Sequence, residues 1–125
     1  MNKVDSKRRA GERGEAYASK MLDKEGYTVI CRNYCCRGGE IDIVAVKGRY
    51  IVFAEVKTRS KDGCENAAEA VDKTKMLRLK NAAEQFLNEY RDNEMIKSLV
   101  PRIDIIEVYT RGGAFCDYRH STAEA

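Results

Sequence analysis

Charged residues interrupt two runs of the chain that otherwise have the composition of buried β-strands. The runs are GEIDIVAV, residues 39–46, and YIVFAEVK, residues 50–57. A charge that leaves water is costly unless it is paired or bound to a metal, so a fold does not place carboxylates in buried strands without compensation. The candidates for a chemical site are therefore the charged residues of these runs, Glu40, Asp42, Glu55 and Lys57.

The register of the hairpin decides whether two of these acids share a face. Side chains alternate across a strand, and a two-residue loop at Lys47 and Gly48 places Asp42 diagonal to Glu55. A four-residue loop, residues 47–50, places the acids directly opposite each other, and a three-residue loop requires a bulge. We therefore expect paired residue numbers with an odd sum, or a bulge. Acids on opposite faces would exclude a shared site.

The chemistry that these residues suit is metal-assisted hydrolysis of a phosphodiester. Two close carboxylates repel each other, which raises the pKa of one of them unless a cation neutralises the pair. Mg²⁺ or Mn²⁺ is suitable because hard cations prefer carboxylate, carbonyl and water oxygens. Lys57 shares a strand face with Glu55 and can orient or deprotonate a water, or stabilise charge on a phosphate. The alternative is a solvated acidic hairpin end with local ion pairs.

Two predicted helices carry further candidates. The first spans about Lys7 to Glu25 and ends at Gly26, and Glu15 lies at the edge of its apolar stripe. The second runs from about Glu69 or Asp72 to Tyr90. Its apolar stripe includes Lys75, which either extends to solvent along its methylene stem or points at an acidic group.

The whole chain, residues 1–125, is predicted to be a single α/β domain with order αβββαββ and a mixed sheet flanked by the helices. The hairpin at its centre is apolar on both faces near the tip, which indicates a place in the middle of a covered sheet. Residues 1–6 and 119–125 are expected to be frayed. The predicted strands are 27–33, 40–46, 50–57, 102–109 and 114–118, with a loop at 60–68 and a connector at 91–101.

Bulk composition narrows the class of protein. No apolar run is long enough to cross a membrane, and the N-terminal segment has no apolar stretch typical of a signal peptide. The five cysteines are an odd number and indicate reduced thiols, so we expect a cytoplasmic protein. The net charge of +3 is only mildly basic. The positive charge is nevertheless concentrated on the two helices, which indicates contacts with nucleic acid phosphates by Arg8, Arg9, Arg13, Lys73, Arg78 and Lys80.

Other readings of the polar residues are weaker. The cysteines and His120 contain no CxxC pair, which disfavours structural zinc, and His120 is expected to be exposed in the C-terminal tail. A Ser or Cys nucleophile has no convincing histidine partner. Glu40 can either pair with Lys57 or Arg37 or join the metal ligands, and we favour the first, supporting role. Asp104 is expected to form a structural ion pair with Arg102 or another basic residue.

The same residues also resemble a known family. The series GERGEAYASKML, GY, RN, GEIDIV, FAEVKTR and RIDIIEV, from about Gly11 to Val108, is similar to the YraN family, also called UPF0102. The resemblance implies the restriction-endonuclease-like fold of the PD-(D/E)XK nucleases and a similarity to archaeal Holliday junction resolvases. It also implies roles at individual positions: Asp42, Glu55 and Lys57 as the D, E and K of the signature, Glu15 as the first-helix acid, Lys75 as the lysine of the following helix, and Val56 as a carbonyl ligand of the metal.

Together these observations lead us to expect an Mg²⁺- or Mn²⁺-dependent endonuclease that acts on DNA, with branched or structured DNA as a candidate substrate. Paired cuts in a junction need two sites, so a homodimer is an attractive assembly. The alternative is a non-catalytic nucleic-acid-binding module on a nuclease-like scaffold, because a fold does not by itself establish a reaction.

Overall fold

The order of helices and strands follows the sequence prediction, with one short extra helix. A computed structural model describes residues 3–62 and 72–124, with side chains in the first helix from residue 11 onward. The elements are α1 (Lys3–Lys24), β1 (Thr28–Cys36), β2 (Gly39–Lys47), β3 (Tyr50–Ser60), α2 (Lys73–Glu89), α3 (Glu94–Lys97), β4 (Val100–Arg111) and β5 (Ala114–Glu124). The addition is α3, whose start is capped by the Asn93 side chain.

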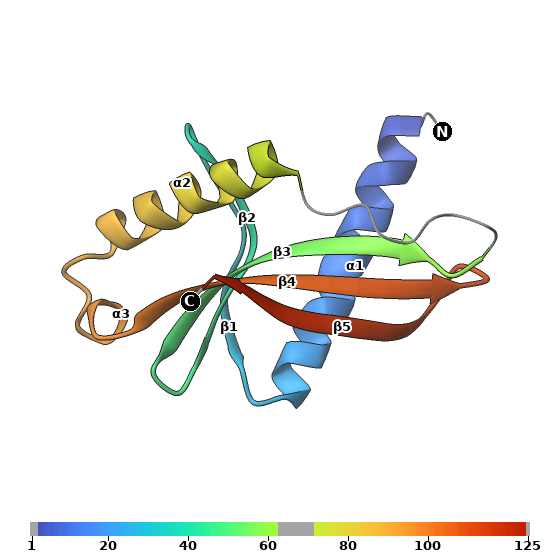
Figure 1. Cartoon of the computed structure of the whole chain (residues 1–125). Coiled ribbons are helices and arrows are strands. Elements are labelled where there is room, and N and C mark those ends of the chain that lie inside the picture. The colour runs from blue at the N-terminus through green and yellow to red at the C-terminus, as the bar shows by residue number, and fades with distance from the viewer. Residues whose placement is uncertain (1–2, 63–71, 125) are drawn as a thin grey trace.

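The strands form one mixed sheet in the order β1-β2-β3-β4-β5, in which only β3 and β4 run parallel. The hairpin β2–β3 therefore lies inside the sheet, as its apolar composition predicted. β2 and β3 pair near the tip of the hairpin and then separate (Figure 1). The first half of β2 continues beside β1, whereas the second half of β3 continues beside β4. The sheet is consequently forked, and the fork opens at the point where the candidate acids lie.

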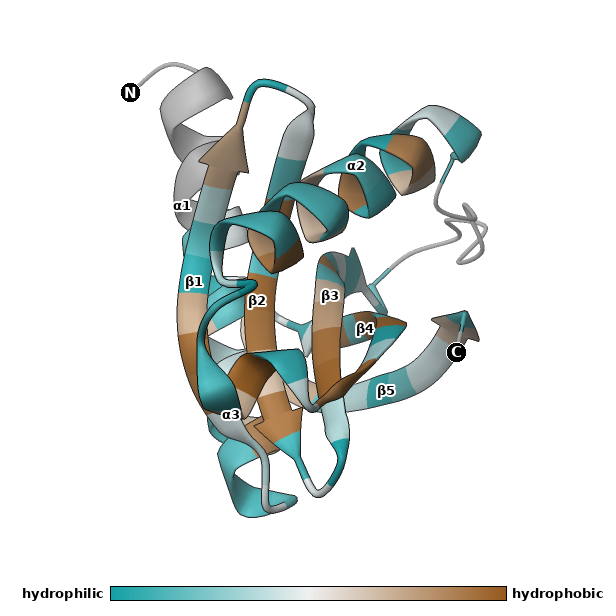
Figure 2. Ribbon diagram, turned by 90° about the vertical axis from the view of Figure 1, so that its left-hand side faces the viewer, coloured by the Kyte–Doolittle hydropathy of each residue, from teal (hydrophilic) through white to brown (hydrophobic). Residues whose placement is uncertain are grey.

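Each face of the sheet is covered by one helix, and each helix forms a separate hydrophobic cluster. On one face, α2 packs Leu79 and Phe86 against Phe53 of β3. On the other face, α1 packs Ala18 and Leu22 against β2, β3 and β4. Hydrophobic colour concentrates on β2, β3 and the inner side of α2, and hydrophilic colour on its outer side (Figure 2). This is the helix-flanked α/β architecture that was predicted.

The hairpin register agrees with the prediction that paired residue numbers have an odd sum. Ile43 pairs with Ala54 and Lys47 with Tyr50, and the two numbers of each pair add up to an odd number. The connecting turn contains Gly48, whose φ of 59° lies in the left-handed region that glycine adopts readily. Pairing ends at Ile43 and Ala54, so Asp42 and Glu55 follow the last pair without being paired themselves. The turn consists of Gly48 and Arg49, because Lys47 pairs with Tyr50, and it is therefore neither of the two loops that were predicted.

Two glycines allow the helices to come close to the sheet. A Cβ atom on Gly39 would lie 2.0 Å from the backbone carbonyl oxygen of Arg78 in α2, so the start of β2 tolerates no side chain there. A Cβ atom on Gly14 of α1 would lie 2.3 Å from Oγ1 of Thr58 in β3. These close approaches bring α2 and α1 to opposite sides of the fork.

The ends of several elements differ from the prediction. β5 continues to Glu124, so residues 119–124 are a strand and not a frayed tail. They pair with β4, including His120 with Ile106. α1 begins at Lys3 and includes residues 3–6, which were expected to be frayed. β1 extends through Cys36, beyond its predicted end at Asn33.

Other predicted segments agree more closely. α2 begins after Asp72, whose side chain accepts a hydrogen bond from the backbone N–H of Lys75 and caps the helix. Most of the predicted loop at residues 60–68, including Cys64, lies outside the described residues. Among the helices that are described, none has the length and apolar character needed to cross a membrane.

Candidate active site

Asp42 lies in the fork of the sheet. Its Oδ2 atom accepts a 2.8 Å hydrogen bond from the backbone N–H of Val56. Pairing between β2 and β3 stops at Ile43 and Ala54, so the Asp42 carboxylate satisfies a backbone donor at the start of the separated region. Asp42 thus has a structural role in addition to any chemical one.

A break in both neighbouring strands accounts for the position of Asp42. Residues on one face of a regular strand differ by an even number, yet Ile41 and Val44 of β2 pack on the same side, and so do Cys31 and Tyr34 of β1. Ile43 packs on the opposite side of the sheet from Ile41. The regular alternation of side chains between the two faces of the sheet is therefore interrupted between Ile41 and Val44 in β2, and between Cys31 and Tyr34 in β1.

The residues at the break face each other across the two strands. Arg32 pairs with Ile43 and Tyr34 with Ile41, which places Asn33 opposite Asp42. Asn33 has a φ of 56°, and it is the one non-glycine residue with positive φ among the described residues. Such a conformation is uncommon for a residue with a side chain, although asparagine tolerates it better than most.

Glu15 and Glu55 approach Asp42 from different elements. Both side chains are largely buried, with 12% of each exposed. Burial first, and then the Asp42 carboxylate, raise the pKa of Glu15 to about 7. The same two causes in the same order raise the pKa of Glu55 to about 7. We call Glu15, Asp42 and Glu55 the acid cluster.

Two lysines complete the inner part of the site. Nζ of Lys57 lies 4.0 Å, and Nζ of Lys75 lies 3.9 Å, from Oε1 of Glu55. Lys75, in α2, thus points at an acid, which was one of its two predicted positions. Burial, and then the neighbouring Lys75, lower the pKa of Lys57. The contact with Lys57, and more weakly the Glu55 carboxylate, raise the pKa of Lys75.

Sequence reasoning did not select two residues of β1 that contact Glu15. Nη2 of Arg32 lies 3.8 Å from Oε2 of Glu15, and the Asn33 side chain acts to lower the pKa of the same carboxyl group, against the larger effects of burial and Asp42. The only available signal was the dipeptide RN in the family resemblance. Glu40 was assigned to Lys57 or Arg37, but it lies 3.8 Å from Nη2 of Arg78 instead.

The acid cluster has the donor chemistry of a site for a hard divalent cation. Oε2 of Glu15 is buried and accepts no hydrogen bond from the described residues, and its ion-pair partner among them is Nη2 of Arg32 at 3.8 Å, so this oxygen could accept a further ligand. The donors are carboxylates, as Mg²⁺ and Mn²⁺ prefer. In the part of the chain that the structure describes, however, no group of three or more His, Cys, Asp or Glu side chains is already arranged to hold a metal ion.

The predicted phosphate-binding residues are dispersed, and most of those described have intramolecular partners. Arg13 donates a hydrogen bond to the carbonyl of Gly113 and lies over the ring of Phe115. Arg78 contacts Glu40, and Nζ of Lys80 lies 2.9 Å from Glu124. Lys73 is exposed at the start of α2. The side chains of Arg8 and Arg9 lie outside the described residues.

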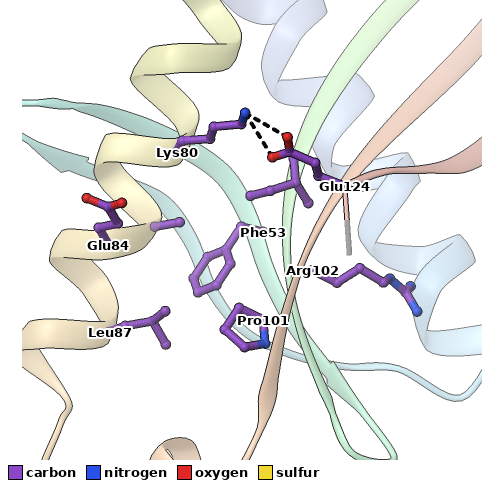
Figure 3. Close-up of a pocket in the computed structure, with 9 residues that line it drawn as sticks. Phe53, Lys80, Glu84, Leu87, Pro101, Arg102 and Glu124 are labelled. Carbon is purple, nitrogen blue, oxygen red and sulfur yellow. Dashed lines mark hydrogen bonds and ion pairs between the residues drawn. The ribbon is translucent and has the colours of Figure 1, made fainter.

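A pocket of about 330 Å³ lies away from the acid cluster, between α2 and the strands β4 and β5. Phe53, Leu87 and Pro101 form apolar walls, and the ion pair of Lys80 with Glu124 lies at its edge (Figure 3). The Arg102 side chain extends away from these apolar walls. None of the acid cluster lines this pocket, so it does not belong to the candidate site.

His120 belongs to a second polar cluster and not to an exposed tail. Its Nε2 atom lies 2.5 Å from Oδ2 of Asp104, a fully buried carboxylate. Nη2 of Arg102 lies 2.7 Å from the same oxygen, so the predicted Arg102–Asp104 ion pair is present. Nδ1 of His120 lies 3.5 Å from Glu25 at the end of α1. The prediction that His120 is exposed was wrong because β5 is longer than expected.

Comparisons with known proteins identify related chains over most of the sequence. A family model described as "Uncharacterised protein family UPF0102" matches residues 14–108. A UPF0102 protein of Chloroflexus aurantiacus is 42% identical over 117 residues, which cover 94% of this chain and 92% of the relative. Another from Caldicellulosiruptor saccharolyticus is 40% identical, covering 83% and 85% of the two chains. A third, from Moorella thermoacetica, is 48% identical, covering 66% and 68%.

Proposed function

The chain belongs to the uncharacterised protein family UPF0102, and we propose that it is an Mg²⁺- or Mn²⁺-dependent endonuclease that hydrolyses DNA phosphodiester bonds. The observation that carries this proposal is the convergence of the acid cluster with Lys57 and Lys75 in the fork of the sheet. Raised carboxyl pKa values beside an amine with a lowered pKa are typical of active sites. Carboxylates that can hold a metal ion and amines that can act on a water or a phosphate come from separate elements and meet there. This combination suits the hydrolysis of a phosphodiester.

The acid cluster would hold the divalent ion. Asp42, Glu55 and Glu15 are the side-chain ligands in this proposal, and the backbone carbonyl of Val56 is a further one. A bound ion would polarise the phosphate and lower the pKa of a water molecule. Because burial and the Asp42 carboxylate raise the pKa of both Glu15 and Glu55, we propose that these two groups release protons when the ion binds.

Lys57 and Lys75 have different roles in this proposal. Lys57, whose pKa is lowered by burial and by Lys75, accepts a proton from the attacking water or orients that water. Lys75 retains its proton and neutralises charge on the phosphate oxygens. Arg32, whose side chain is 38% exposed beside Glu15, extends the positive charge toward the outer side of the site and contacts the DNA backbone.

The test is cleavage of end-labelled DNA by the purified protein in Mn²⁺, in Mg²⁺ and in chelator. Duplex, single-stranded and four-way-junction substrates of matched sequence define the preferred structure. Cleavage that requires the metal and is lost in Asp42→Ala and Lys57→Ala supports the proposal. Absence of cleavage of every substrate in Mn²⁺ contradicts it. Paired cuts in the junction would require two active sites, which a homodimer would supply. Sedimentation of the protein with and without junction DNA tests for this homodimer.

A second candidate function is a nucleic-acid-binding module without catalysis. The observation in its favour is that the described carboxylates do not form a ready three-ligand metal group. This alternative predicts DNA binding that weakens with salt but is unchanged by Asp42→Ala and Lys57→Ala, together with no cleavage. Binding and cleavage measured on the same two variants separate the candidates.

A further inference from the structure

We propose that Asn33 is a positioning residue for the acid cluster, whose left-handed backbone sets Asp42 in the fork of the sheet. The inference rests on the proposed function for its chemical purpose. Its structural content depends only on the arrangement of β1, β2 and β3.

The first step concerns the position of Asn33 relative to Asp42. Asn33 lies between Arg32 and Tyr34, and Asp42 lies between their pairing partners Ile43 and Ile41, so the two residues face each other across β1 and β2. Pairing of β2 with β3 ends at Ile43 and Ala54, so Asp42 lies in the part of β2 that pairs with β1 alone. A change in the backbone of Asn33 acts directly on the central acid.

The second step concerns the backbone conformation. The φ of 56° at Asn33 occurs where both strands lose one alternation, as the same-side packing of Tyr34 with Cys31 and of Ile41 with Val44 shows. A regular pair of strands would direct Asp42 onto one face of the sheet. The break instead leaves its carboxylate within hydrogen-bonding distance of the Val56 N–H on the neighbouring strand.

The third step concerns strain and its location. A left-handed conformation is unfavourable for a residue with a side chain, and such residues are concentrated at functional sites. The other described positive φ values belong to glycines at the end of α1 and in turns. Asn33 alone carries a side chain in this conformation within the described residues, and it lies beside the central acid. Neither Asn33 nor Arg32 is required by the hydrophobic clusters.

Two substitutions separate the backbone from the amide. Asn33→Gly retains access to the left-handed conformation and removes the amide, whereas Asn33→Ala removes the amide and disfavours the conformation. Gly48→Ala is the matched control, because Gly48 also has a left-handed φ, at 59°, with nothing within 4 Å of an added Cβ atom. It introduces the same kind of strain at the hairpin tip, away from the acids.

The first readout does not involve metal. Amide hydrogen exchange of Val56, measured by NMR in chelator, reports the hydrogen bond to Asp42. We expect wild-type protection in Asn33→Gly and about tenfold faster exchange in Asn33→Ala, while Gly48→Ala leaves Val56 protected. Loss of protection in the glycine variant, or full protection in the alanine variant, overturns the backbone role. If the alanine variant does not fold, the glycine variant alone still tests that role.

The second readout is Mn²⁺ affinity by titration calorimetry. Asn33→Ala should weaken binding by about 10–100-fold, the usual effect of disturbing a group that orients a metal ligand, because it displaces Asp42, whereas Asn33→Gly and Gly48→Ala should not change it. Unchanged affinity in Asn33→Ala contradicts the positioning of Asp42 for a metal. If the wild-type protein binds no Mn²⁺, the proposed nuclease function fails, whereas Val56 exchange still decides the backbone role. If it binds Mn²⁺ but cuts no DNA, only the nuclease function fails.

Discussion

The backbone N–H of Val56 donates a 2.8 Å hydrogen bond to Oδ2 of Asp42 across the gap between β3 and β2. The same carboxylate is next to Glu15 and Glu55, whose pKa values it helps to raise. One side chain thus serves both the backbone of the fork and the charge balance of the acid cluster, and two substitutions at this position separate these roles.

Asp42→Asn should preserve folding and abolish metal-dependent chemistry. The asparagine carbonyl can still accept the Val56 N–H, so we expect the free energy of unfolding to remain within about 1 kcal/mol of wild type. Asp42→Ala leaves that donor without its partner and should cost about 1–3 kcal/mol. Urea unfolding in chelator measures both values, and Mn²⁺ titration measures the lost site. Equal stability of the two variants would contradict the capping role of Asp42.

Stability in chelator should fall as the pH rises from about 4.5 to about 7. Over that range the folded protein retains protons on Glu15 and Glu55, whose pKa values are raised from 4.5 to about 7. The unfolded chain has already released those protons. Because the folded state binds more protons, the free energy of unfolding decreases with pH.

Glu15→Gln tests this assignment. The variant should be more stable than wild type at pH 7.5, and its stability should depend less on pH, although it loses Mn²⁺ affinity. Glu12→Gln changes an exposed carboxylate on the same helix and should leave the slope unaltered. Urea unfolding at pH 5 and pH 7.5 provides the comparison. If the free energy of unfolding changed with pH equally in Glu15→Gln and in wild type, Glu15 would not contribute to the pH dependence of stability.

The two lysines should differ in their effect on the pH dependence of cleavage. Lys57→Arg replaces a proton acceptor with a group that does not titrate, so we expect at least about 10²-fold slower single-turnover cleavage. Lys75→Met removes a positive neighbour that lowers the pKa of Lys57, so the acidic limb of the rate profile should move to higher pH. Lys24→Met, an exposed lysine of α1, is the control. Identical profiles for Lys75→Met and wild type would argue against coupling of the lysines.

The polar cluster around His120 should stabilise the fold most strongly in acid solution. The hydrogen bond to Asp104, against the opposing effect of burial, raises the pKa of His120 above its ordinary value of 6.5. Glu25 also faces the imidazole, and Arg102 shares the Asp104 carboxylate. A raised histidine pKa contributes stability that is full below about pH 6.5 and is lost as the pH rises through the folded value.

His120→Gln should therefore cost about 2 kcal/mol at pH 6 and clearly less at pH 9. Arg119→Gln changes its exposed neighbour on β5 and serves as the control. Urea unfolding at the two pH values measures the difference. A cost that does not change with pH would show that the imidazole acts through packing alone. Below about pH 4 the lowered pKa of Asp104 makes the cluster lose stability again as that carboxyl protonates.

The sequence was most informative where local rules suffice. Alternation along the two hairpin strands was enough to predict paired residue numbers with an odd sum, which the register has. The apolar character of both hairpin faces placed it inside the sheet. The helical stripe that contains Lys75 left two positions open for this side chain, toward solvent or toward an acid, and the structure has it beside Glu55. The resemblance to UPF0102 is confirmed by the matching family model and relatives.

Long-range relationships were beyond such rules. The left-handed Asn33 has no local signature, because asparagine occurs in ordinary strands and turns as well. Arg32 contacts Glu15 only after β1 and α1 meet across the sheet. β5 is an edge strand with a polar C-terminal half, so nothing in HSTAE distinguishes a paired strand from a frayed end. His120 was misplaced for that reason, and its partner Asp104 lies on another strand.

The placement of Asn33 opposite Asp42 and the register of the β2–β3 hairpin also restrict how the gene can change in length. An inserted residue within β2 or the paired part of β3 would shift Asp42 or Glu55 by one position and turn its side chain toward the opposite face. Insertions at the hairpin tip beside Gly48, or in the turn at Arg37 and Gly38, leave the pairing intact. Between residues 33 and 55, length variation among functional descendants should therefore be confined to those two turns, as a deep insertion scan of the coding sequence would reveal.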